Sequence, residues 1–470
     1  MQTTTFTYLA FLAAVTFLHW SLRGTRPRTL LLLASSWIFY AWWDVRFLPV
    51  LLVTSLVDWA VGLKVGAVPR GWPRTLLVAV SCAGNLGLLA LFKYFDFGAG
   101  LAAAAAEAVG LSLHPPQLDL PLAVGLSFYT FQSLSYVIDV ARGEREPERD
   151  LPTFMTYVSF FPLLAAGPIE RAAHLLPQIR KERTFDAEEG ADGCREILSG
   201  LFLKLALADN LAIHVDAVYG SAAPSGPAIA LATVAFAFQI YWDFAGYTAI
   251  ARGSARLLGV ELVRNFERPY FAASLRDFWR RWHISLSTWF RDYVYRPLGG
   301  SRGGRARTAA NLIATFVLSG LWHGAALHFV AWGAFHGIAL AAERGLARSA
   351  APPPSRLRLA LRQARTFAIV CAGWILFRAS SFPDAVAKFY RIAADAARVD
   401  LIVEALAGAW WIPVVIAGGC TVEWLSRPHP HPLAVHRWPI PLRWTLYTLL
   451  FWSALWLAPW EGRAFVYFQF

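Results

Sequence analysis

The chain has 470 residues, of which 57% are hydrophobic and only 16% are charged, and its mean hydropathy is +0.44. These values exclude an ordinary soluble protein of this size and predict a polytopic membrane protein. The formal net charge of +12 does not indicate nucleic-acid binding, because the arginines stand in short loops between apolar runs, where the positive-inside bias places them.

Apolar runs long enough to cross a bilayer, about 20 residues each, recur along the whole chain. We therefore predict one membrane-embedded domain, residues 1–470, with no separate soluble domain. Arg23, Arg26 and Arg28 follow the first run, which predicts a cytoplasmic loop there and an N-terminus on the outer side. The predicted spans are 6–22, 30–43, 47–65, 75–92, 122–140, 197–218, 229–250, 365–378, 401–422 and 442–459.

Several other segments are too short or too polar to span. Residues 101–109 are alanine-rich and predict an interfacial or re-entrant helix. Residues 154–166 predict a re-entrant segment that stops at Gly167-Pro168, because proline removes a backbone donor. We also expect surface helices near Ile179 and at 384–398, and a polar linker at 182–194. With these segments the chain has about eleven or twelve membrane elements.

Residues 252–307 hold the strongest basic surplus of the chain. Twelve arginines stand there against four acidic residues, a surplus of eight within a total net charge of twelve. Trp279, Trp282 and Trp289 interleave with the arginines, which is typical of interfacial helices whose indoles face lipid while guanidinium groups reach toward water. We therefore predict cytoplasmic interfacial helices in this range.

Residues 308–342 are 35 in number and contain no Asp, Glu, Lys or Arg. This run is too long for one straight span and short for two full ones, since each needs about 20 residues. It predicts two shortened helices that meet inside the membrane, with the break at Ser319-Gly320 or at Gly324. His323 stands at this break, ~24 Å along a helix from Arg307.

His323 is the leading candidate for chemistry. A polar side chain at bilayer depth faces a cavity or a partner, and neutral imidazole can take and return a proton near pH 7. The alternative is a structural histidine bonded to a carbonyl that the break frees. Trp322 and Ser319 are candidate supporting residues, whereas His328 and His336 are assigned to packing or lining. No carboxylate or cysteine completes a ligand set, so no metal is predicted.

His283 is the second candidate, within the basic range. The spacing of its sequence neighbours predicts a helix with five residues on one face: Arg276, Trp279, Arg280, His283 and Ser287. Asp277 and Arg281 can pair beside it. Such a helix either only fixes topology or forms a cationic mouth for an anionic donor, such as the phosphates of coenzyme A. The candidate donor-binding residues are Arg280, Arg281, Trp279 and Trp282.

Asp243 is the only charged residue between Asp216 and Arg252. An acid at that depth is functional or paired, and pairing with an arginine of the basic range is favoured over catalysis. Tyr241, two residues earlier, is a further candidate for support of the site.

Many short motifs in the same order make the sequence similar to the membrane-bound O-acyltransferase family. The resemblance is strongest to its bacterial branch of alginate O-acetylation and teichoic acid D-alanyl transfer proteins, and to the alginate type in particular. The motifs begin at Leu91, Gly125, Ala166, Ala208, Gln239, Asn265, Phe278, Arg291, Ser319 and Phe468.

The resemblance implies an all-α ring of about 11–12 tilted transmembrane and re-entrant helices around a thinned core, in the bacterial cytoplasmic (inner) membrane. It implies that His323 is the catalytic histidine and His283 the second characteristic one. With His323 as general base, an acetyl group would pass from a cytoplasmic thioester, acetyl-CoA, toward an extracytoplasmic hydroxyl of an exopolysaccharide or cell-wall glycan. No cofactor is expected to stay bound.

The resemblance also implies a partner, a periplasmic or membrane-anchored acetyltransferase that acts on a polysaccharide. Two other functions stay open. One is D-alanyl transfer from a phosphopantetheine carrier protein to teichoic acid. The other is a membrane transporter or flippase, because intramembrane histidine and aspartate also occur in that class.

Overall fold

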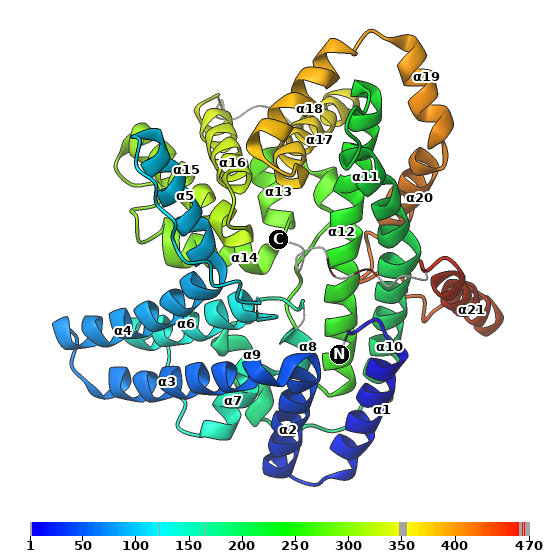
Figure 1. Ribbon diagram of the computed structural model, residues 1–470. Coiled ribbons are helices and arrows are strands. Elements are labelled where there is room, and N and C mark those ends of the chain that lie inside the picture. The colour runs from blue at the N-terminus through cyan, green and yellow to red at the C-terminus, as the bar shows by residue number, and fades with distance from the viewer. Residues whose placement is uncertain are drawn as a thin grey trace. The chain divides into compact units, whose positions relative to one another are not determined.

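The computed structural model describes residues 2–121, 123–164, 166–346, 355–459, 463 and 465. Every regular element within these ranges is helical (Figure 1), in agreement with the predicted all-α class. The chain divides into two compact units, which we describe separately. The first is Met1–Cys194 with Ala251–Val263, and the second is Arg195–Ile250 with Arg264–Phe470.

Three helices of the first unit meet at a buried carboxylate. Asp58 is fully buried and accepts hydrogen bonds from the side chains of Ser81 at 2.6 Å, Asn85 at 2.9 Å and Ser133. These bonds join α3, α4 and α6, which pack against one another. The helices are α1 Phe6–Ser21, α2 Thr25–Asp44, α3 Leu48–Ala67, α4 Trp72–Leu89, α5 Phe95–Ala108, α6 Leu126–Arg142, α7 Leu151–Ser159, α8 Phe161–Leu164, α9 Ala172–Arg180 and the first part of α10 Ala187–Leu201.

Two predictions for this unit need correction. The separate short helix predicted at 101–109 is wrong, because a π-helical segment, Ala90–Tyr94, joins α4 to α5 in one continuous helix. Alanine is the strongest helix former, so the run extends the span before it. The polar linker at 182–194 is helical from Ala187, because the Asp186 carboxylate accepts the backbone N–H groups of Glu188 and Glu189 as a cap.

The second unit carries the remaining helices. They are the end of α10, the π-helical segment η3 Phe202–Ala208, α11 Asp209–Tyr219, α12 Gly226–Leu257, the 3-10 helix η4 Pro269–Phe271, α13 Leu275–Arg281, α14 Ile284–Phe290, the π-helical segment η5 Arg291–Tyr295, α15 Gly304–His323, α16 Leu327–Leu346, α17 Arg356–Arg378, α18 Phe382–Ala394, α19 Val399–Gly408, α20 Trp411–Leu425 and α21 Ile440–Trp456. The last turns of α12 belong to the first unit.

Five helical segments in the described residues are long and apolar enough to cross a membrane: Thr25–Ala67, Trp72–Ala108, Ala187–Tyr219, Gly226–Leu257 and Arg356–Arg378. α19 and α20 make a sixth if the pair, bent by 68°, counts as one span. The chain is therefore a multi-pass membrane protein. The number is below the ten spans predicted. The predicted spans 30–43 and 47–65 lie in one continuous helical segment, and α1, α6 and α21 have only 16 or 17 residues.

α15 and α16 lie side by side as a hairpin (Figure 1), and glycine makes their contact possible. A Cβ at Gly320 would lie 2.1 Å from the carbonyl oxygen of Phe329, and one at Gly333 would lie 2.2 Å from that of Phe316. Helices in membranes use small residues in this way to bring their backbones together. The hairpin therefore holds the break between its two helices in a fixed place.

Replacing Gly320 with alanine is expected to destabilise the hairpin by about 1–3 kcal/mol, because the added methyl group overlaps a backbone atom that cannot turn away. Thermal unfolding of the purified protein in detergent measures the effect. Gly345→Ala is the matched control, since a Cβ at that position of α16 meets no atom within 4 Å. Equal melting of the two variants would contradict this packing.

Candidate active site

His323 is the last residue of α15, immediately before the helix breaks. Gly324 adopts an extended backbone conformation, and α16 begins only at Leu327. The break therefore lies at Gly324, one of the two positions considered from the sequence. His323 is 5% exposed. Its position at a helix C-terminus favours a positive charge, because the carbonyl ends of the helix carry partial negative charge.

Aromatic rings surround the imidazole of His323. The ring centroids of Trp322 and Trp332 each lie 5.0 Å from it, and that of Phe377 in α17 lies 5.3 Å away. All three rings stand edge-on, at interplanar angles between 76° and 86°. Such walls exclude water, and electrostatic interactions are stronger where water is excluded. Ser319, one turn earlier on α15, is also buried.

His283 lies between α13 and α14, with a left-handed backbone (φ +41°). The continuous helix predicted through this position is therefore wrong, because α13 ends at Arg281. His283 is also buried, at 1% exposure, although interfacial helices were predicted for this range. Its ring lies 4.7 Å from that of Phe244 and 6.1 Å from that of Trp322. Trp322 thus contacts both candidate histidines, and burial lowers the pKa of His283 to about 3.

Asn265 fixes this unusual conformation. Its carbonyl oxygen accepts the N–H of Ile284 at 2.8 Å, and its side-chain oxygen accepts the Ser285 hydroxyl at 2.6 Å. Asn265 is fully buried, so both bonds are shielded from water. No role was predicted for Asn265 from the sequence, although it begins one of the motifs on which the family resemblance rests.

The candidate donor-binding residues separate into exposed and buried ones. Arg280 is exposed, and Arg281 is partly exposed and pairs with Asp277 at 2.9 Å, as predicted. Trp279 is partly buried, with its ring 4.9 Å from that of Phe316. Trp282 is instead 1% exposed and packs in an aromatic core. Its ring neighbours in that core are Tyr241, Phe266, Tyr270, Phe278 and Trp374.

The ring of His336 lies next to that of Trp332, which in turn lies next to that of His323. Its centroid lies 5.1 Å from that of Trp332 and 5.0 Å from that of Trp279. It is fully buried, and within the described part of the chain neither ring nitrogen has a hydrogen-bond partner. Gly373 of α17 makes room for it, since a Cβ there would lie 2.4 Å from its Nε2. His328, assigned with it to packing, has its ring 4.2 Å from that of Phe329.

Asp243 belongs to a buried ion cluster. The ammonium nitrogen of Lys204 lies 2.7 Å from its carboxylate and 2.5 Å from that of Asp209. The arginine partner predicted for Asp243 is thus replaced by a lysine. Close contact between helices permits this reach, because a Cβ at Gly246 would lie 3.2 Å from that of Lys204. The neighbouring Phe244 carries the ring that contacts His283.

Tyr241, the other supporting candidate on α12, is 5% exposed. The carboxyl group of Glu423 in α20 lies close to the Tyr241 hydroxyl and to the side chain of Trp242. Glu423 was not singled out from the sequence, because it follows the predicted span 401–422 directly. Tyr241 therefore faces α20 and belongs to the aromatic core around Trp282.

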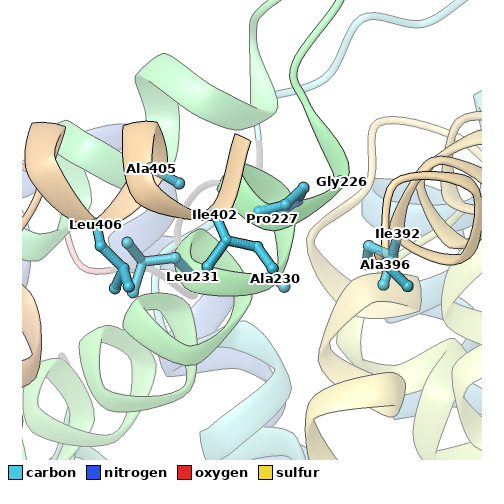
Figure 2. Close-up of a pocket in the computed structure, with 9 residues that line it drawn as sticks. All are labelled: Gly226, Pro227, Ala230, Leu231, Ile392, Ala396, Ile402, Ala405 and Leu406. Atoms are coloured by element: carbon cyan, nitrogen blue, oxygen red, sulfur yellow. The ribbon is translucent and has the colours of Figure 1, made fainter. Parts of the chain in front are cut away.

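An apolar pocket lies elsewhere in the second unit (Figure 2). Its volume is about 290 Å³. Side chains of the start of α12, the end of α18 and α19 line it: Gly226, Pro227, Ala230, Leu231, Ile392, Ala396, Ile402, Ala405 and Leu406. None of them can accept or donate a proton, so the pocket is not where acid–base chemistry takes place.

A multi-pass membrane protein that buries one histidine at a broken helix, with a second histidine across a shared tryptophan, has the features of a membrane-embedded transferase. A sequence profile of the membrane-bound O-acyltransferase family matches residues 144–382, just over half of the chain. The chain belongs to this family, and it is an O-acyltransferase. The match includes all the site residues described above except Glu423.

Named relatives cover more of the chain. The Probable alginate O-acetylase AlgI of Pseudomonas syringae is 40% identical over 362 residues, 77% of this chain and 69% of the relative. The peptidoglycan O-acetyltransferase of Helicobacter pylori is 33% identical over 387 residues, 77% of this chain and 72% of that protein. The teichoic acid D-alanyltransferase of Bacillus subtilis is 28% identical over 287 residues, 57% and 71% of the two chains.

Proposed function

We propose that the chain transfers an acetyl group from acetyl-CoA on the cytoplasmic side to a hydroxyl group on the opposite side of the membrane, with His323 as the general base. The acceptor belongs to an exopolysaccharide or a cell-wall glycan, or to a partner that modifies one. The observation that carries this proposal is the burial of His323 at the break after α15, in a chain with relatives named as O-acetylases.

In the proposed reaction the imidazole of His323 removes the proton of the acceptor hydroxyl while the hydroxyl oxygen attacks the carbonyl carbon of the thioester. The carbon–sulfur bond then breaks, and the leaving thiolate takes the proton back from the imidazolium. The C-terminus of α15 stabilises this imidazolium while it exists. The aromatic rings around it exclude water, which would otherwise compete as the acceptor.

His283 acts in this proposal as a neutral helper, and Trp322 fixes its distance from His323. Its buried, uncharged imidazole can bind a donor or acceptor group but is a poor acid at neutral pH. Positioning of the two substrates by such groups contributes to the rate together with proton transfer.

Arg280 is the proposed contact for the phosphates of the donor. It is exposed on α13, and no ion pair with it is found in the described residues. Arg280→Gln is expected to raise the KM for acetyl-CoA about tenfold with little change in kcat, because a charge-assisted bond to phosphate contributes to binding alone. Arg302→Gln, an exposed arginine of the same basic range, is the control. An unchanged KM for Arg280→Gln would remove this contact from the proposal.

The proposed setting is the bacterial inner membrane, where a periplasmic or membrane-anchored acetyltransferase receives the acetyl group or directs it onto the polysaccharide. Support comes from relatives named for modification of alginate and of peptidoglycan, both of which lie outside the cytoplasm. Alginate is thus one candidate polymer, which would place the chain in alginate biosynthesis.

The proposal is tested with membranes from cells that express the chain together with its neighbouring genes. One sample receives acetyl-CoA labelled in the acetyl group, and a parallel sample receives a carrier protein loaded with labelled D-alanine. Ester label from acetyl-CoA alone is the expected result. Label from the D-alanyl carrier alone would replace acetylation by D-alanyl transfer, the activity named for relatives at 28% identity. No ester from either donor would overturn the proposal.

A further inference from the structure

The end of α1 carries a cluster of basic side chains around Trp20, all within the first unit. The guanidinium carbon of Arg28 lies 5.0 Å from the centre of the Trp20 ring. The ring of His19 lies 4.9 Å from the same indole. A Cβ at Gly259 would lie 3.2 Å from the Cδ of Arg183 and 3.1 Å from Trp20. Two guanidinium groups and one imidazole therefore lie around one tryptophan.

Arg183 is the unusual member of this cluster. It is 8% exposed, and none of its three side-chain nitrogens has a hydrogen-bond partner in the part of the chain that the structure describes. Burial and the neighbouring Arg28 lower its pKa to about 10, so it stays protonated at neutral pH. A buried, charged guanidinium without an acceptor is strongly unfavourable, and proteins normally pair such a group.

The neighbours of Arg183 do not compensate its charge. Arg28 donates to the carbonyl oxygen of Arg183 at 2.5 Å and to that of Leu22 at 3.0 Å, so it adds a second cation and no acceptor. His19 is fully buried, and both of its ring nitrogens also lack partners in the described residues. The cluster therefore presents several unused donors and a net positive charge.

We propose that His19, Arg28 and Arg183 form a binding site for a phosphate group. Phosphate provides several acceptor oxygens and the negative charge that the cluster lacks, and the planar guanidinium fork matches its geometry. The outer wall of the cluster is Phe185, whose ring packs edge-on against Trp20 at 5.5 Å and is 57% exposed. This side chain is the one that must turn aside when the ligand enters.

Two sources share this chemistry. The basic loop at Arg23 to Arg28 predicts a position at the cytoplasmic membrane surface, where the headgroup of an anionic phospholipid and the phosphates of a soluble donor are both within reach. If the ligand is the soluble donor, this site rests on the proposed function; if it is a lipid headgroup, it does not. The experiment measures ligand binding and not acetyl transfer, so its result is independent of whether the chain acetylates an acceptor.

The test uses the purified full chain in detergent, with binding measured by native mass spectrometry and by the ligand-induced rise in melting temperature. Phosphatidylglycerol is compared with a phosphate-free diacyl glycolipid, and coenzyme A with dephospho-coenzyme A. Arg183→Met is expected to weaken binding of the phosphate ligand at least about tenfold, the loss of one charge-assisted contact. Lys181→Met, which removes an exposed charge from the same loop, should bind as the wild type does.

Selective loss of phosphatidylglycerol binding in Arg183→Met would identify a lipid headgroup, and selective loss of coenzyme A binding would identify the soluble donor. Without ligand, Arg183→Met should melt no lower than the wild type, because the removed charge had no partner. His19→Phe, a second variant of similar shape, should also weaken binding. Unchanged binding of both phosphate ligands in Arg183→Met, or a lower melting temperature without ligand, would overturn the proposal.

Discussion

Replacing His323 with alanine is expected to reduce acyl transfer at least about a hundredfold, because general acid–base catalysis contributes 10² to 10⁴ to a rate. The substitution removes the imidazole at the end of α15 and leaves the surrounding tryptophans in place. His323→Gln, which preserves the polarity and most of the volume, should lose activity to a similar degree. The rate is measured in membranes that contain equal amounts of inserted protein.

The other histidines make this result specific. His114, exposed in a loop of the first unit, provides the control, and His114→Ala should have full activity. His336→Gln tests whether the next imidazole in the row, also buried beside Trp332, is the base instead. Full activity of His323→Ala, or a greater loss in His336→Gln, would exclude His323 as the base.

Replacing Lys204 with methionine is expected to destabilise the protein by about 3–5 kcal/mol, the range for breaking one side of a buried ion pair. The carboxylates of Asp209 and Asp243 would lose the ammonium group that both contact, and both are almost fully buried. The melting temperature in detergent should fall sharply. Activity should fall too, since Asp243 precedes the phenylalanine that packs on His283.

The triple variant Lys204→Met, Asp209→Asn, Asp243→Asn separates charge from packing. It removes all three charges and keeps similar volumes, and well-packed neutral replacements of buried ion pairs are often tolerated. Most of the lost stability should therefore return. A triple variant as unstable as the single one would show that the lysine stabilises the helices by its packing and not by its charge.

The position of His323 could be predicted from the sequence because the constraint on it is local. An uncharged run of 35 residues does not fit one span or two, so a helix must break within it, and glycine follows the histidine. The structure places the break at that glycine. Whether His323 is the base depends on chemistry that neither the run length nor the fold determines.

The surroundings of His283 could not be predicted in the same way. Helical spacing suggested one continuous face, but a non-glycine residue with positive φ interrupts the helix. The bonds that hold it come from Asn265, which is distant in the sequence. The partner of Asp243 was missed for a related reason, because Lys204 lies in a π-helical segment and a regular helical spacing does not give its direction.

The proposed transfer of an acetyl group across the membrane is tested most directly with sealed right-side-out vesicles from cells that express the chain with its neighbouring genes. Labelled acetyl-CoA is enclosed in the lumen, and alginate oligosaccharide is supplied outside together with the surface glycan already present. We expect labelled ester on the external carbohydrate with the wild-type chain and none with His323→Ala. Label confined to the lumen, or equal external ester with both chains, would contradict it.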